Sequence, residues 1–213
     1  MAALRALGAR SLPVVARGGR FVYAQVISDV VGFLGLNEAA GPVLAPAALA
    51  GRASAVLATA ARLVRQFPDA VLGNTLPNRP RSWRVLAHHV FQIPIAFLEM
   101  EETGRRLEYE TLVAPPPDDM ATSASIAAFG EAVRARFERW WAGAAEADFG
   151  QAVETYFGRT SRHEMLERTV WHSAQHVRQL AALLQSIGIA PDRPLGAAEL
   201  RDLPLTDRIW DEG

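Results

Sequence analysis

Apolar residues recur at intervals of three and four along most of the chain, which is the spacing of an amphipathic helix. The pattern predicts long helices over residues 46–67, 82–102, 123–144 and 162–187. Ser82 and Ser123 are suited to be N-caps, and Ser161 with Glu164 predicts a capping box at the start of the last helix. Gly188 is placed to end that helix.

Several amphipathic helices in one small domain are typical of a helical bundle. We therefore predict a mainly α fold in which residues 46–188 form an up-and-down four-helix bundle. No part of this range alternates convincingly between apolar and polar residues, so we expect no strand in it. A proline-containing connection over residues 103–121 is long enough to cross between the second and third helices.

The first forty residues have a different pattern. In residues 12–24, LPVVARGGRFVYA, strand-forming residues flank Gly18–Gly19, which predicts a β-hairpin with Pro13 near its start. A short helix over residues 26–35 should follow and end at Gly35. Because a two-stranded hairpin is marginal alone, it should pack on the helices or on a second subunit. We accordingly divide the chain into residues 1–40 and 41–213.

Composition excludes several kinds of chemistry. The 213 residues contain no cysteine and no lysine, which rules out disulfides, thiolate ligands and a protein Schiff base. A formal net charge of −1 argues against nucleic acid as a partner. No stretch approaches about 18 unbroken apolar residues, so no membrane span is expected. The arginine-rich start lacks the serines of a transit peptide, and we expect a cytoplasmic protein.

The histidines carry the candidate chemistry. His172 and His176 are four residues apart, which places both imidazoles on one helix face, on the stripe expected to point inward. His89 lies on the apolar stripe of the second helix, whereas His88 lies about 100° round the axis. His163, in the first turn of the last helix, should be an exposed or capping residue.

Two interpretations of these histidines remain open. They are either ordinary core and surface residues, or His89, His172 and His176 together bind a divalent metal such as zinc, nickel or iron(II). Three inward imidazoles without a cation would bury several polar nitrogens that each need a partner. No phosphate-binding glycine loop and no hydrolase or zinc-protease motif accompanies them.

Two segments resemble a known family, the DinB-like (DinB/YfiT) four-helix bundles. LAHHVFQ in the second helix and HSAQHVRQL in the last are similar to the two histidine motifs of that family. The matching positions are Leu86, His89, Val90, His172, His176, Gln179 and Leu180. The resemblance covers about residues 46–188. It implies a divalent cation on His89, His172 and His176, often a homodimer, and relatives that are metal-dependent transferases or isomerases using small thiols.

The N-terminal segment has a weaker resemblance, to the C-terminal half of a glutaredoxin. The similarity lies in the order of elements, which is a strand that begins just after Pro13, a second strand that pairs with it, and a final helix. The remaining strand and helix and the redox cysteines of that fold are missing, so thiol–disulfide exchange is excluded. This remnant either packs on the bundle as a structural appendage or retains part of a thiol-binding surface.

The function expected from these features is that of a metal-dependent transferase or hydrolase. It would act on a small-molecule substrate, with a low-molecular-weight thiol such as glutathione as co-substrate. Arg79, Arg81 and Arg84 either recognise a carboxylate on that thiol or are solvated surface charges, and composition favours the second. The alternative function is a non-catalytic, stress-associated or metal-binding bundle. No catalytic acid or base is identified.

Overall fold

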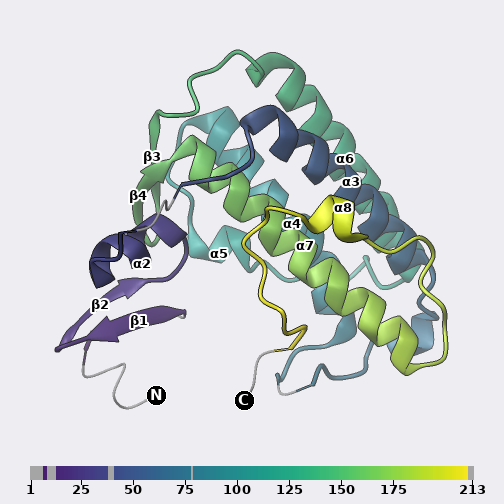
Figure 1. Ribbon diagram of the computed structural model, residues 1–213. Coiled ribbons are helices and arrows are strands. Elements are labelled where there is room, and N and C mark those ends of the chain that lie inside the picture. Colours follow the sequence, from purple (N-terminus) through teal and green to yellow (C-terminus); the bar gives the residue numbers. More distant parts are fainter. Residues whose placement is uncertain (1–6, 9–12, 38–40, 78, 211–213) are drawn as a thin grey trace.

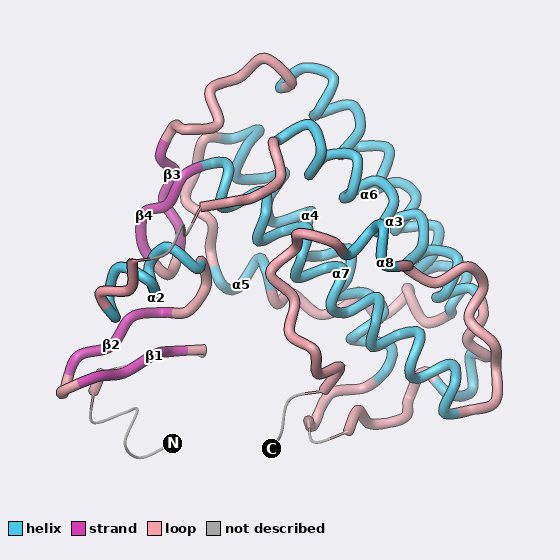
Figure 2. Tube along the Cα trace, in the orientation of Figure 1, coloured by secondary structure: helices cyan, strands magenta, loops and turns pink. Residues whose placement is uncertain are grey.

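The computed structural model describes residues 7–8, 13–37, 41–77 and 79–210 (Figures 1 and 2). The protein is mainly helical, with 55% of the described residues in helices. The described residues form four long helices, three short helices, one 3-10 turn and two hairpins. The long helices are α3 (Pro46–Arg65), α4 (Trp83–Thr103), α6 (Ser123–Ala144) and α7 (Arg162–Ser186). The short elements are β1 (Val14–Arg17), β2 (Arg20–Tyr23), α2 (Ile27–Leu34), η1 (Asp69–Val71), α5 (Tyr109–Leu112), β3 (Ala152–Thr155), β4 (Gly158–Ser161) and α8 (Ala197–Leu200).

Each long helix packs against two others and encloses one apolar core. α3 contacts α6 and α7, and α4 contacts the same two helices from the other side. Phe91 and Phe97 of α4 and Phe137 of α6 are almost fully buried where these helices meet. Burying large aromatic side chains stabilises the packed helices by about 1.5–3 kcal/mol each relative to exposure. The expected helix bounds are confirmed to within two residues at each end.

Polar contacts between helix ends identify two antiparallel pairs. Asp69, just after α3, accepts hydrogen bonds from the backbone and hydroxyl of Ser123 at the start of α6. Glu101, near the end of α4, pairs with Arg162 at the start of α7. Consequently α3 runs opposite to α6, and α4 runs opposite to α7.

Two further contacts identify the parallel pairs. Arg84 in the first turn of α4 donates to the Met120 carbonyl just before α6. The His163 ring in the first turn of α7 bonds the Leu44 carbonyl just before α3. The expected up-and-down order is therefore wrong, because the two middle long helices, α4 and α6, run in the same direction. The connection through α5 spans the length of α4 and makes this order possible (Figure 1).

Two local predictions within the helical region are wrong. Residues 46–188 do contain strands, because β3 and β4 form an antiparallel hairpin between α6 and α7. The sequence signal for this hairpin is short. The more buried residues Val153, Thr155 and Phe157 alternate with polar or exposed positions, but the run is too short to be distinguished from a loop. The N-cap of α6 is Thr122 and not Ser123, since the Thr122 hydroxyl accepts from the Ser125 backbone.

The N-terminal hairpin and helix form as expected. β1 and β2 pair antiparallel around Gly18 and Gly19, whose φ angles of 57° and 75° suit glycine. α2 ends at Gly35, which has a φ of 68°. Residue 12 of the expected hairpin segment lies outside the described residues. Val26 is buried in the main core, so this unit packs on the long helices.

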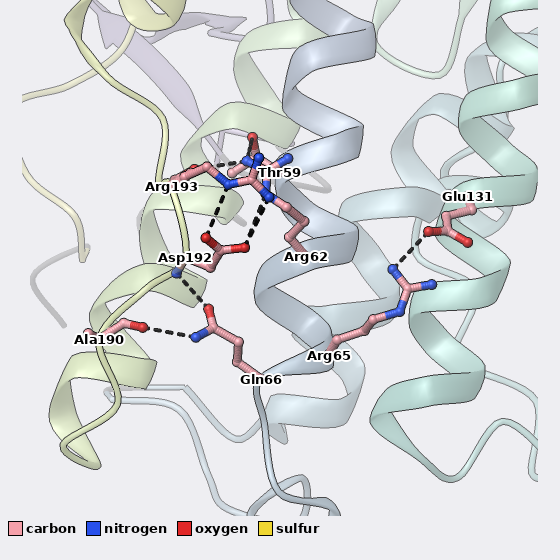
Figure 3. Close-up of polar contacts among 8 residues, drawn as sticks. All are labelled: Thr59, Arg62, Arg65, Gln66, Glu131, Ala190, Asp192 and Arg193. Carbon is pink, nitrogen blue, oxygen red and sulfur yellow. Dashed lines mark hydrogen bonds and ion pairs between the residues drawn. The ribbon is translucent and has the colours of Figure 1, made fainter.

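The C-terminal segment lies along the outside of α3 and α7 (Figures 1 and 3). Gln66 at the end of α3 donates to the Ala190 carbonyl at 2.9 Å and accepts from the Asp192 backbone at 2.7 Å. Arg62 donates to the Arg193 carbonyl at 2.9 Å. Further along, the segment crosses α7, and its described part ends at residue 210. It is held by polar contacts to two helices.

α3 is the only described helix whose length and composition would allow it to cross a membrane. More than half of its most apolar window is buried inside the protein. Leu49, Val56 and Leu63 on this helix are fully buried against α6 and α7. Such burial is typical of a core helix in a folded domain.

Candidate metal centre

His89, His172 and His176 converge, as the sequence predicts. His89 lies in the second turn of α4, and the other two lie one turn apart in the middle of α7. Because α4 and α7 pack against each other, the three rings meet between them. One ligand nitrogen from each residue lies within 4.8 Å of the other two. The ring centroids are 4.9–5.6 Å apart.

The donor set fits a divalent cation. Nδ1 of His172 and Nε2 of His176 are buried and have no hydrogen-bond partner among the described residues. An unpartnered buried nitrogen is costly, and coordination of one cation would satisfy both. Tetrahedral ligands at about 2.1 Å from a metal are about 3.4 Å apart, so the imidazole nitrogens would have to approach one another to bind one.

A second contact orients the His176 ring. Its Nδ1 donates to Oε1 of Gln179 at 2.7 Å, which fixes the tautomer and leaves the lone pair of Nε2 available. Gln179 is held in turn, because its amide donates to the Ile209 carbonyl at 2.9 Å. The C-terminal segment therefore supports the orientation of a candidate ligand.

The surroundings keep the three imidazoles neutral. Burial, with a smaller effect of His176, lowers the pKa of both His89 and His172 well below the ordinary value. Burial also lowers the pKa of His176 to about 4, although its hydrogen bond to Gln179 acts in the opposite direction. Neutral imidazole is the form that coordinates metal. The candidate ligands are thus in the required state at neutral pH.

The other two histidines lie outside the cluster. His88 is buried rather than exposed, and its ring stacks on Phe129 of α6 with centroids 5.1 Å apart. Burial lowers the pKa of His88 to about 4. His163 was expected to be exposed, but it is partly buried, because its ring bonds the Leu44 carbonyl at 2.8 Å. The choice of His89 over His88 as the inward residue agrees with this geometry.

A pocket opens beside His176. Arg79 and Arg81, from the loop before α4, line it together with Gln179 and Trp210. Arg84, the third arginine of that loop region, instead bonds the Pro117 and Met120 carbonyls and has a structural role. The pocket is small, with a volume of about 10 Å³, which is room for about one water molecule.

A buried arginine adjoining the cluster is absent from the sequence-based site. Arg168 is 2% exposed and lies one turn before His172 on the same face of α7. Its guanidinium donates to the Gln25 side chain and to the Tyr156 hydroxyl, while Nη1 has no partner among the described residues. The four-residue spacing between Arg168 and His172 was a sequence signal that both lie on the same helix face. The burial of Arg168 could not be expected from it, because arginine side chains are mostly exposed.

Comparison with known proteins identifies no relative. No protein-family model matches the chain, and no curated protein shows significant similarity to it.

Proposed function

We propose that the chain is a DinB-like four-helix bundle in which His89, His172 and His176 bind a divalent cation. The observation that carries this proposal is the convergence of three neutral imidazoles from α4 and α7, two of which present unpartnered buried nitrogens. The nitrogen donor set suits zinc, nickel or iron(II). The motif resemblance in these two helices, which includes the same three histidines, is a second support.

The reaction that suits this site is transfer or hydrolysis on a small electrophile. A divalent cation with three imidazole ligands retains an open position, at which a bound thiol or water has a pKa near neutrality. The chain's own contribution is to hold the imidazoles neutral and to orient His176 through Gln179. A low-molecular-weight thiol such as glutathione is the proposed co-substrate.

A second candidate function is a metal-binding bundle without catalysis. It is favoured by the burial of two of the three candidate ligands, since His89 and His176 are less than 9% exposed, whereas His172 is partly buried. No carboxylate that could serve as a general base lies in the histidine cluster among the described residues. The two functions differ in turnover and not in metal content.

Metal analysis of protein purified without a histidine tag tests the centre. We expect about one divalent ion per chain, and almost none in the variant His89→Ala/His172→Ala/His176→Ala. His163→Gln is the matched control, because it removes an imidazole that bonds Leu44 outside the cluster. Equal metal content in the triple variant and the wild type would contradict the proposal.

Turnover separates the two functions. The metal-loaded protein is incubated with glutathione and a panel of electrophiles, and loss of free thiol is followed with and without a chelator. Consumption of thiol that disappears in the triple variant supports the transferase. Metal binding without turnover supports the non-catalytic bundle. Light scattering in the same buffer tests the proposed homodimer, and localisation of a tagged chain in the cell tests the proposed cytoplasmic location.

A further inference from the structure

Polar contacts hold the C-terminal segment on α7. Arg178 of α7 donates to the Thr206 and Asp207 carbonyls at 2.7 and 3.0 Å. Gln175 donates to the Ile209 carbonyl at 2.9 Å. In each contact a side chain of the helix binds the backbone of the segment. The position of the segment therefore does not require its own side chains to fill the space beneath it.

An apolar cavity lies between the segment and α7. Its volume is about 190 Å³. Val177 and Ala181 line it from α7, and Leu195, Leu200 and Ile209 line it from the segment. The three residues from the segment are only partly buried, although their side chains are large and apolar. The segment thus leaves apolar surface uncovered on the side that faces the helix.

The lining of the cavity favours an uncharged molecule. Arg178 is the only charged residue among the described lining residues, and its two Nη atoms already bond the Gln175 side chain and two backbone carbonyls. An ion that enters apolar surroundings without a partner loses its hydration at a high cost. A cavity of about 150 Å³ lined by apolar side chains binds benzene. This cavity therefore has room for one aromatic ring with a small substituent.

We propose that the cavity binds a small, uncharged aromatic molecule and that the bound molecule strengthens the metal centre. The link is Ile209, which lines the cavity and whose carbonyl accepts from Gln179 at 2.9 Å. Gln179 accepts in turn from the His176 ring at 2.7 Å. A molecule packed against Ile209 favours the position of the segment in which both hydrogen bonds are intact. Only the effect on the metal centre rests on the proposed function.

Fluorine NMR with fluorobenzene tests the site in the metal-free protein. This probe has one aromatic ring and no charge, and its signal changes when it is bound. The charged comparison is para-fluorobenzoate. Ala181→Phe and the slimmer Ala181→Met place a side chain in the cavity. Ala128→Phe is the matched control, because Ala128 is an exposed alanine in the middle of α6.

We expect fluorobenzene to bind the wild type and Ala128→Phe with a dissociation constant of about 0.1–1 mM, since burial of one ring is the main driving force. Both Ala181 variants should bind it at least about ten-fold more weakly, because the added side chain occupies the cavity. The wild type should bind para-fluorobenzoate about ten-fold more weakly than fluorobenzene, because its carboxylate loses hydration. Unfolding midpoints show which variants are folded, and the two Ala181 variants keep the test valid if the bulkier one is not.

Zinc titration with and without saturating fluorobenzene tests the effect on the metal centre. Fluorobenzene should tighten zinc binding about five-fold, and zinc should tighten fluorobenzene binding by the same factor, since coupling between two sites is reciprocal. Gln179→Leu should abolish this response, because it breaks the link between His176 and Ile209. An unchanged zinc affinity with fluorobenzene bound would overturn the coupling.

Three results would overturn the site itself: no saturable binding of fluorobenzene, unchanged affinity in a folded Ala181 variant, or equal affinity for fluorobenzene and para-fluorobenzoate. Binding that disappears as the protein dimerises would place a second copy over the cavity and would also overturn it. Fluorobenzene binding by a protein that takes up no zinc would leave the site standing and refute the metal centre. Zinc binding through the three histidines without fluorobenzene binding would do the reverse.

Discussion

At the scale of single residues, Gln179 links the candidate ligands to the rest of the molecule. Its side chain accepts from His176 and donates to the C-terminal segment, so it fixes both the tautomer and the ring angle of one ligand. Partners of this kind usually change metal affinity by ten- to a hundred-fold when they are removed. The motif in the sequence contains Gln179, but only the structure shows the role of its amide.

Gln179→Leu should therefore weaken zinc binding about ten- to a hundred-fold, because the His176 ring loses its acceptor. Competition with a chromophoric chelator measures the affinity. Gln175→Leu is the matched control, since the Gln175 side chain donates to the Arg208 and Ile209 carbonyls, whereas the acceptor of the His176 ring is Gln179. Zinc affinities that agree within two-fold between the two variants would contradict the role given to Gln179.

Glu164 makes stability depend on acid pH. Burial raises the pKa of its carboxyl group, but hydrogen bonds from Ser28, Ser161 and Thr160 outweigh this effect and hold it below 4.5. A carboxyl group with a lowered folded-state pKa adds stability above its unfolded-state pKa and loses it as the pH falls through the folded value. The contribution should therefore be complete at neutral pH and decline below about pH 4.5.

Urea unfolding of Glu164→Gln tests this dependence. At pH 7 the variant should lose about 1–2 kcal/mol of unfolding free energy, because three donors lose a charged acceptor. The difference from the wild type should shrink as the pH is lowered from 4.5 toward 3. A difference that stays constant over that interval would show that the charge of Glu164 does not contribute.

At the scale of the elements, α6 approaches α4 closely at Gly130. A Cβ atom on Gly130 of α6 would lie 2.3 Å from ring carbons of Phe91, which is fully buried on α4. The absence of a side chain at Gly130 therefore allows these helices to approach. This need outweighs the helix propensity that alanine would add at an interior position.

Gly130→Ala should lower the free energy of unfolding by about 1–3 kcal/mol, since the added methyl group displaces a core aromatic ring. Gly51→Ala should instead raise it by about 0.5–1 kcal/mol, because Gly51 lies in α3 with no atom near the added methyl group. Chemical denaturation of both variants measures the difference. Stabilisation by both substitutions would mean that Phe91 moves aside without cost.

The long helices and two of their three predicted N-caps could be predicted because their signals are local. The hydroxyl of Ser161 and the side chain of Glu164 form the expected capping box, and Ser82 caps α4. The β3–β4 hairpin was missed, since each strand has only four residues and its pairing depends on the ends of α6 and α7. The pocket and the burial of Arg168 arise from segments far apart in the sequence, and periodicity carries no information about them.

At the scale of the whole molecule, the N-terminal unit is attached through the first half of α7. Gln25 accepts from the buried Arg168 guanidinium, Ser28 donates to Glu164, and Val26 enters the main core. None of the three candidate metal ligands comes from this unit. Its expected contribution is therefore to stability, with the metal centre provided by α4 and α7 alone.

A chain that begins at Gly41 should unfold about 2–4 kcal/mol more easily than the full chain, because it loses hydrogen bonds to buried partners and one apolar anchor. The full-length variant Gln25→Ala/Ser28→Ala should show part of this loss, which separates the contacts from the truncation itself. Urea denaturation measures stability, and metal analysis of both proteins should still give about one ion per chain. An unchanged unfolding midpoint for the shortened chain would contradict the packing role of the N-terminal unit. Loss of metal from a shortened chain that remains folded would instead place part of the centre's support in residues 1–40.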